Sequence, residues 1–304
     1  MKTEQRKWSP ESGWTPPSAS ADAAAAQLIL VFGATSALKR PSLLAELQRD
    51  YPQARLLGCS TAGEIRDTQV LDDSLVATAV SFEHTQFRGA LVELKGAEDR
   101  ARAGEQLART LPASVPARES GPADPLVPVL VLSDGLKVNG SDLVRGLSRH
   151  LPEGVVVTGG LAGDGGRFTE TLVFLDDAPR PNAVAVLGLY GTRLKVGFGS
   201  LGGWDPFGPE RLITRSRGNV LYELDGQSAL GLYRTYLGDH AKELPASGLL
   251  FPLSLRTGSS ETGVVRTVLA IDDQEQSMTF AGDLPEGAYA RFMKANFDRL
   301  IDGA

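Results

Sequence analysis

Two copies of one strand–helix–strand pattern, offset by 100 residues, constrain the fold of this 304-residue chain most strongly. In the first copy, residues 28–33 (LILVFG) form an apolar run typical of a buried strand, residues 41–50 place leucines on one helical face after a proline, and residues 54–58 form a second strand. The second copy repeats this order at residues 129–133, 141–150 and 155–158. At this offset the copies align without a gap, and each predicts a pair of parallel strands.

A pair of further apolar runs follows each copy, and we predict a β-hairpin for each pair. The first hairpin would join residues 75–82 to residues 87–94 through the polar stretch EHTQ, and the second would lie within residues 183–200. The duplicated units, each a strand–helix–strand pattern plus a hairpin, would therefore lie near residues 28–94 and 128–200.

The remaining chain divides into a leader and a second domain. Residues 1–26 carry charge but no long apolar run, so we predict a flexible leader and not a signal peptide. Residues 27–204 are expected to form a mixed-sheet domain. Residues 205–304 show short strands and one helix, which indicates a smaller, mostly antiparallel α+β domain. The predicted fold class is thus α/β (α+β).

Composition excludes several classes of protein. The net charge is −6 and basic residues are scattered, which argues against binding to nucleic acid. No apolar run approaches the roughly 20 residues that span a bilayer, so we expect no membrane partner. The one cysteine, Cys59, excludes an internal disulfide and fits a reducing compartment. We therefore expect a cytoplasmic location.

Polar stretches follow matching strand ends in the two copies: GCSTAGE at residues 58–64 and GGLAGDG at residues 159–165. In open parallel sheets, ligands bind at the carboxyl ends of strands, so we expect both stretches to border one hollow. The residues that we predict to bind a small ligand are Cys59, Ser60, Thr61, Glu64, Ser133, Asp134, Gly159, Gly160, Asp164 and Arg266.

The chemistry of these residues leaves two interpretations open. Hydroxyls and backbone N–H groups suit a carboxylate or phosphate, and Glu64 and Asp164, which the alignment pairs, suit an ammonium. Alternatively, the acids close turns and the glycines allow positive φ. Arg266 lies inside an alternating apolar strand, where it would bind the ligand or pair with Asp272 or Asp273.

Cys59 also invites an enzymatic hypothesis, that of a thiol-dependent hydrolase or acyl transferase. Such a nucleophile needs a base within reach, and neither His84 nor His150 is an obvious partner. The simpler interpretation is a small buried residue at a turn, and its counterpart in the gapless alignment is Gly159. No G-x-G-x-x-G or Walker-type motif points to a nucleotide.

Four stretches, found in this order, resemble the FIST sensory family of bacteria. They are LLGCSTAGEI, TGGLAGDGGRFTETLVF, LYELDGQSALGLYRTYLGDHAKELPASGLLFPL and AGDLPEGAYARFMKANFDRLIDGA. The resemblance implies a FIST N-terminal and a FIST C-terminal domain and a non-catalytic intracellular sensor of a small ligand, either amino-acid-like or another small carboxylate. It also implies a signalling partner such as a histidine kinase or a cyclic-dinucleotide enzyme.

The resemblance carries one alternative and one departure. A subset of the family is described as haem-containing nitric oxide sensors. This chain would then bind haem b, and His240, in the matching stretch YLGDHAKELP, would be the iron ligand; otherwise His240 is a solvent-facing residue. Family members usually continue past a helix like NFDRLIDGA, so we expect an incomplete C-terminal domain, truncated or naturally short.

Overall fold

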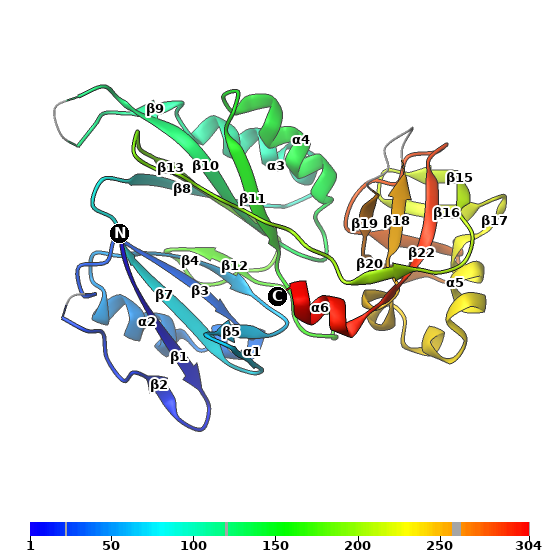
Figure 1. The fold of residues 1–304 in the computed structure, drawn as a ribbon, viewed down its shortest axis with the longest axis horizontal. Helices are drawn as coiled ribbons and strands as arrows, with labels where there is room; N and C mark the ends of the chain where they lie inside the picture. The colour runs from blue at the N-terminus through cyan, green and yellow to red at the C-terminus, as the bar shows by residue number, and fades with distance from the viewer. Residues whose placement is uncertain (22, 119–120, 257–262, 304) are drawn as a thin grey trace. The chain divides into compact units, whose positions relative to one another are not determined.

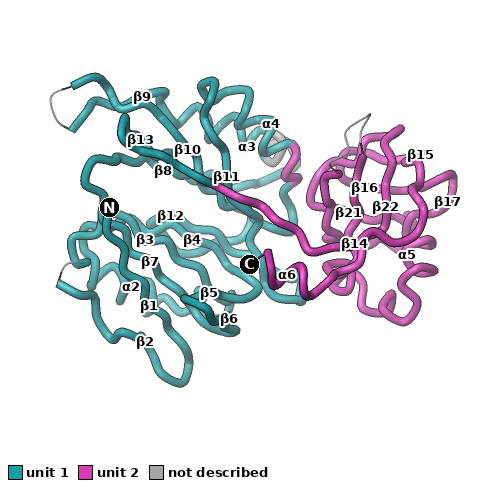
Figure 2. The backbone as a smooth tube through the Cα atoms, viewed as in Figure 1, with its two compact units in different colours: residues 1–138, 142–197 teal, residues 139–141, 198–304 magenta. Residues whose placement is uncertain are grey.

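The computed structural model describes residues 1–21, 23–118, 121–256 and 263–303. Contacts within the chain divide it into two compact units (Figure 2). Unit 1 comprises residues 1–138 and 142–197, and unit 2 comprises residues 139–141 and 198–304. The sequence predicts a domain boundary after residue 204, whereas the contacts divide the chain after residue 197.

Unit 1 contains two sheets, and the first has six strands (Figure 1). In sheet order these are β12 (Val173–Leu175), β4 (Arg55–Ser60), β3 (Leu28–Gly33), β7 (Leu75–Ser81), β1 (Lys2–Ser9) and β2 (Gly13–Thr15). Only β3 and β4 are parallel, as the strand–helix–strand pattern predicts. The helices α1 (Thr35–Leu38) and α2 (Pro41–Asp50) connect them, and α2 buries Leu43 and Leu47.

The second sheet repeats this arrangement. Its strands, in order, are β11 (Val156–Leu161), β10 (Asp124–Ser133), β13 (Ala183–Tyr190) and β8 (Gln86–Glu93), and the short β9 (Ser114–Val115) pairs with the start of β10. β10 and β11 are parallel and are joined by α4 (Gly140–His150). Leu143 and Leu147 of α4 pack in one cluster with Leu107 of α3 (Ala97–Thr110).

Side chains of both sheets meet in an apolar layer between them. Leu57 and Cys59 of β4 lie in this cluster with Leu132 of β10 and Ala185 of β13. The side chains that alternate with these face the helices instead, as Ile29 does in the first sheet. Unit 1 is therefore a four-layer sandwich, with two sheets inside and helices outside (Figure 1).

The predicted hairpins are wrong. β7 pairs with β3 and β1 in the first sheet, whereas β8 pairs with β13 in the second. Both runs have the apolar pattern of strands, but their polar connection passes from one sheet to the other. β8 occupies the place in the second sheet that β1 occupies in the first. In residues 183–200, only β13 is a strand.

The predicted flexible leader is also wrong for its first part. β1 pairs with β7 from Lys2 to Trp8. Arg6 is fully buried: it donates to Asp50 and to the carbonyl oxygens of Pro16 and Pro17 at 2.7–3.1 Å. This part of the sequence is too polar to predict a strand by itself. The reason is that the buried Arg6 is neutralised by Asp50, which lies elsewhere in the chain.

The two copies do not align without a gap. Val31 and Val131 lie opposite Gly58 and Gly159, respectively, in the parallel pairs. The offset is therefore 100 residues in the first strand and 101 in the second. A Cβ on Gly58 or on Gly159 would lie 2.1 or 1.9 Å from the carbonyl oxygen of the facing valine. Gly58 is thus equivalent to Gly159 and Cys59 to Gly160, and the predicted pairing of Cys59 with Gly159 and of Glu64 with Asp164 is wrong.

Unit 2 is mostly antiparallel, as predicted. The strands of its main path are, in order, β19 (Val264–Arg266), β18 (Leu253–Arg256), β22 (Tyr289–Ala295), β15 (Arg211–Arg217), β16 (Val220–Leu224), β21 (Ser277–Phe280) and β20 (Val268–Asp272). β14 (Trp204–Pro206) and β17 (Gln227–Ser228) pair with β22 and β16. The helix α5 (Ala229–Leu237) buries Tyr233 against Phe292, with ring centroids 4.7 Å apart.

Short elements complete the chain. They are the hairpin of β5 (Glu64–Arg66) and β6 (Gln69–Leu71), the 3₁₀ helices η1 (Gly238–Glu243) and η2 (Ala246–Leu249), and the helix α6 (Phe297–Gly303). In the described part of the chain, none of the helices has the length and apolar character that crossing a membrane requires.

Candidate functional site

The two polar stretches that the sequence singles out lie in contact at one edge of unit 1. Ser60 O accepts a hydrogen bond from Gly163 N at 2.8 Å, and Ser133 O accepts one from Ala162 N at 2.8 Å. The carboxyl ends of β4, β10 and β11 therefore converge, as the sequence predicts. We call the stretches 59–64, 133–135 and 159–164 the strand-end loops. Whether they bind a ligand stays a prediction.

The serines of the strand-end loops hold the backbone. Ser60 is fully buried, and its Oγ accepts from Leu172 N at 2.8 Å. Ser133 Oγ donates to Asp134 O at 3.1 Å. The Ser60 hydroxyl thus joins the end of β4 to the residue before β12, whereas the bond of Ser133 is local to its own loop.

Glu64 is buried and ties its loop to the next strand. Its carboxylate accepts from Thr61 Oγ1 at 2.6 Å, from Ser74 Oγ at 2.6 Å and from Ser74 N at 3.3 Å. These bonds join the start of β5 to the residue before β7.

Asp134 accepts four hydrogen bonds, two on each carboxylate oxygen. Its Oδ1 accepts from Leu136 N and Lys137 N at 2.9 and 2.8 Å. Its Oδ2 accepts from Thr171 Oγ1 and Asn182 N at 3.0 and 3.1 Å. Two carboxylate oxygens offer about four lone-pair positions, so Asp134 has little capacity left for a ligand.

The carboxylate of Asp164 closes a turn in its own loop. Its carboxylate accepts from Phe168 N at 3.1 Å, from Thr169 N at 2.8 Å and from Glu170 N at 3.0 Å. These contacts are those expected of an acid that shapes a loop. They favour the structural interpretation that the sequence leaves open for the acids of the strand-end loops.

Cys59 has the surroundings of a core residue. It is 4 % exposed and lies in the apolar layer between the sheets. Burial raises the pKa of its thiol to about 12. Since the thiolate is the nucleophilic form, these surroundings oppose the hypothesis of a Cys59-dependent hydrolase or acyl transferase.

Arg266 belongs to unit 2, at the end of β19, and its predicted pairing with Asp272 or Asp273 is wrong. Its Nε donates to Asp283 O at 3.0 Å, and its Nη2 lies 3.4 Å from Ser141 Oγ. Burial lowers the pKa of the guanidinium, and the charge of Asp283 acts in the opposite direction. Asp272 instead accepts from the backbone N of Gln274, which closes the turn after β20.

His240 lies in η1 and is exposed. Its ring centroid is 5.5 Å from that of Phe251, which packs against Phe207 in the core of unit 2. One face of the imidazole therefore contacts the core and the rest meets solvent, which does not supply the enclosed apolar surroundings of a haem pocket. Binding of haem through His240 stays a prediction that rests on the family resemblance.

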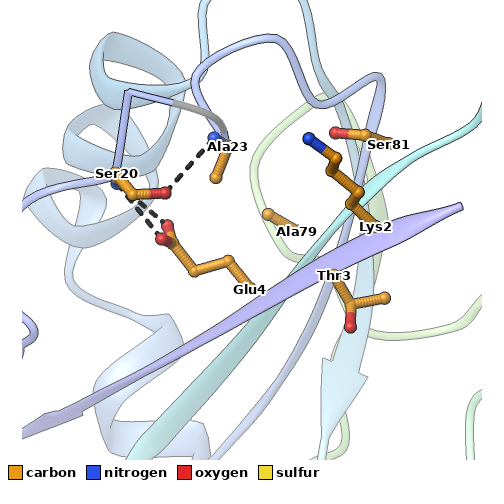
Figure 3. Close-up of a pocket in the computed structure, with 7 residues that line it drawn as sticks. All are labelled: Lys2, Thr3, Glu4, Ser20, Ala23, Ala79 and Ser81. Atoms are coloured by element: carbon orange, nitrogen blue, oxygen red, sulfur yellow. Dashed lines mark hydrogen bonds between the residues drawn. The ribbon is translucent and has the colours of Figure 1, made fainter.

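A hollow that the sequence analysis missed lies at the start of the chain. It has a volume of about 430 Å³ and is lined by Lys2, Thr3, Glu4, Ser20, Ala23, Ala79 and Ser81. We call it the N-terminal hollow. Lys2 and Glu4 point to the same side of β1, and their partners in β7 are Ser81 and Ala79 (Figure 3).

Glu4 brings a negative charge to the N-terminal hollow. Its Oε1 accepts a hydrogen bond from Tyr51 OH at 2.7 Å. Oε1 and Oε2 also accept from Ser20 N, at 3.3 and 3.2 Å (Figure 3 shows the Ser20 bonds). Burial raises the pKa of this carboxyl, but the hydrogen bonds from Ser20 and Tyr51 and the charge of Arg6 outweigh it, so the pKa is lowered. Glu4 is therefore a carboxylate at neutral pH.

One feature of the sequence indicates β1, the strand that borders this hollow. Arg6 and Trp8 alternate with polar residues, and both are buried on the face of β1 that carries Lys2 and Glu4. Alternation of buried and polar residues over so short and charged a stretch is a weak signal. It predicts a strand only when the residues that pair with the charges are known.

Comparison with protein families matches residues 27–227 to the FIST N domain and residues 229–304 to the FIST C domain. These are domains of signal transduction with a sensory role. The chain belongs to the FIST family, as the four stretches in the sequence predict. A comparison with curated proteins found no match.

Proposed function

We propose that this chain is a non-catalytic sensor that binds a small amino-acid-like ligand in the N-terminal hollow. The observation that supports the proposal is the ionised Glu4 carboxylate, which lines the same hollow as the Lys2 side chain. A ligand with an ammonium and a carboxylate carries the complementary pair of charges. The volume of about 430 Å³ lies within the range of roughly 300–1,000 Å³ that small-molecule sites have.

Recognition would use both ends of the hollow. Glu4 Oε2 accepts one long bond, from Ser20 N at 3.2 Å, so it retains a lone pair for the ligand ammonium. The ligand carboxylate would accept from Lys2 and from the hydroxyl of Ser81. Ala23 and Ala79 leave room between the two ends, because their side chains are short (Figure 3).

A sensor must bind its ligand with different affinity in two states. Ser20 lies in the segment between β2 and β3 and is held to β1 through Glu4. A ligand at Glu4 would compete with or reinforce this bond, and so would change how firmly the segment is held. The signal would then pass to a partner such as a histidine kinase or a cyclic-dinucleotide enzyme.

The test is a calorimetric titration of the full chain with each common amino acid. We expect one group of them to bind, and Glu4→Gln to weaken binding at least tenfold, because the ligand ammonium then loses its counter-charge. Glu153→Gln changes an exposed acid outside the hollow and is the matched control. Thr61→Val tests the strand-end loops in the same assay.

Two results would refute this site. If Glu4→Gln binds the amino acid as tightly as the unchanged chain, the hollow is not where the ligand lies. If Thr61→Val alone abolishes binding, the ligand site is at the strand-end loops. A chain that binds none of the amino acids refutes the ligand class.

A further inference from the structure

The duplication leaves one strand edge covered in the first sheet and uncovered in the second. β4 is covered on its outer side by β12, which runs antiparallel to it. Its counterpart β11 ends the second sheet, and across the described ranges 1–21, 23–118, 121–256 and 263–303 no strand pairs with its outer side. Gly159 and Gly160 are exposed, and Leu161 is 37 % exposed.

The backbone groups of β11 that face outward follow from the pairing. Ala162 N donates to Ser133 O, on the side of β10. Because backbone groups alternate along a strand, those of Val157, Gly159 and Leu161 face away from β10. In the first sheet the same alternation holds: Thr61 N donates inward, to Gly33 O.

On the covered side of β4, the outward groups are satisfied by β12. Ser60 N donates to Leu172 O, and Asp176 N donates to Leu56 O, both at 2.8 Å. Phe174 lies between these bonds, directly opposite Gly58. Its own backbone therefore faces β4, whereas Val173 N faces the other way and donates to Arg180 O at 3.0 Å.

A glycine and an aromatic ring fit together at this covered edge. A Cβ on Gly58 would lie 2.6 Å from the ring of Phe174, so the ring uses the space that the absent side chain leaves. Gly159 is the counterpart of Gly58 by register and by its approach to Val131 O. The second sheet thus repeats the glycine of this pair and leaves it uncovered.

We propose that the outer edge of β11 docks an extended segment of a partner protein, antiparallel to β11, with an aromatic side chain opposite Gly159. Addition of a strand to a free edge satisfies the backbone groups, and the side chains that alternate along it give specificity. The chain's own sequence Val173-Phe174-Leu175 on β4 indicates the chemistry of the segment: apolar, with a central aromatic. β11 has no aromatic residue, so a second copy of β11 would leave Gly159 without this cover.

The probe is a fluorescent peptide with the sequence of residues 171–177, TLVFLDD, titrated with the full chain and followed by anisotropy. We expect saturable binding. N-methylation of the phenylalanine should weaken binding at least tenfold, because it blocks the N–H that would face β11. N-methylation of the valine is the matched control and should leave binding within twofold, because that N–H faces away. Replacement of the phenylalanine by glycine should also weaken binding.

Leu161→Pro tests the strand itself, since it removes an outward N–H of β11. It should abolish binding while circular dichroism and the melting temperature stay those of the unchanged chain. If this variant does not fold, the two N-methylated peptides still decide the question.

Three outcomes overturn the proposal. The first is that the peptide does not bind at millimolar concentration, and the second is that the two N-methylated peptides bind alike. The third is that a folded Leu161→Pro chain binds the peptide as tightly as the unchanged chain, which would place the peptide on β4 instead. A fourth outcome, a dimer in sedimentation that Leu161→Pro dissociates, would also overturn it, because the edge would then belong to a second copy of this chain. None of these results depends on an amino acid, so they are separate from the test of the N-terminal hollow.

Discussion

At the scale of single residues, this structure places charged groups where only distant partners justify them. Arg6 is the clearest case. Its guanidinium lies over the rings of Trp14 and Tyr51, 4.8 and 5.9 Å from their centroids, and donates to Asp50. The sequence shows only a polar stretch here, because Asp50, the acid that neutralises Arg6, lies 44 positions further along the chain.

Arg6→Ala should lower the free energy of unfolding by about 3 kcal/mol, because it removes one partner of a buried ion pair and leaves two proline carbonyls without their donor. Urea denaturation measures this change. Arg49→Ala, at an exposed arginine beside the same Asp50, should change it by less than about 0.5 kcal/mol. Equal losses in the two variants would contradict the role that we assign to Arg6.

Cys59 gives a prediction about pH. Its pKa is raised by burial from 9.0 to about 12, so above pH 9 the unfolded chain loses a proton that the folded chain keeps. Stability should therefore fall as pH rises, by about 1 kcal/mol between pH 9 and 10, and Cys59→Ala should remove this part of the slope. Denaturation at both pH values measures it. Parallel slopes for the two chains would show that the thiol is accessible to water.

At the scale of elements, the strand–helix–strand units followed from the sequence and the hairpins did not. Apolar periodicity reports that residues 75–82 and 87–94 are strands, but it says nothing of which sheet each one joins. β8 joins the second sheet because β1 already pairs with β7 in the first. Because β1 is polar, the sequence did not predict that β1 pairs with β7.

The register of the duplicated strands can be tested with two neighbouring glycines. Gly159→Ala should lower the free energy of unfolding by more than about 2 kcal/mol, because its Cβ would meet Val131 O at 1.9 Å and its φ is +150°. At Gly160 a Cβ has nothing within 4 Å, so Gly160→Ala should change stability by less than about 0.5 kcal/mol. Thermal melts of the two variants compare them, and equal melting temperatures would contradict the register.

At the scale of the whole molecule, the sequence predicts the family, the mixed class of the fold and the duplicated crossover units. It also predicts that the strand-end loops meet, because equivalent strands of a duplicated unit end at equivalent places. It leaves open whether Glu64, Asp134 and Asp164 are committed to their own loops. Glu64 and Asp134 use donors that the fold brings to them, Ser74 and Asn182, whereas Asp164 uses the backbone of its own loop.

The features that the sequence determined differ from those that only the tertiary structure decided, and the difference has one physical reason. The sequence by itself determined the elements whose pattern of burial repeats over a few residues, and it determined the duplication, because a repeat needs no knowledge of contacts. The tertiary structure alone decided that β1 completes a sheet, that Glu4 is ionised beside Tyr51, and that β11 keeps an uncovered edge. Each of these depends on residues far apart in the chain, and local periodicity contains no information about which of them meet.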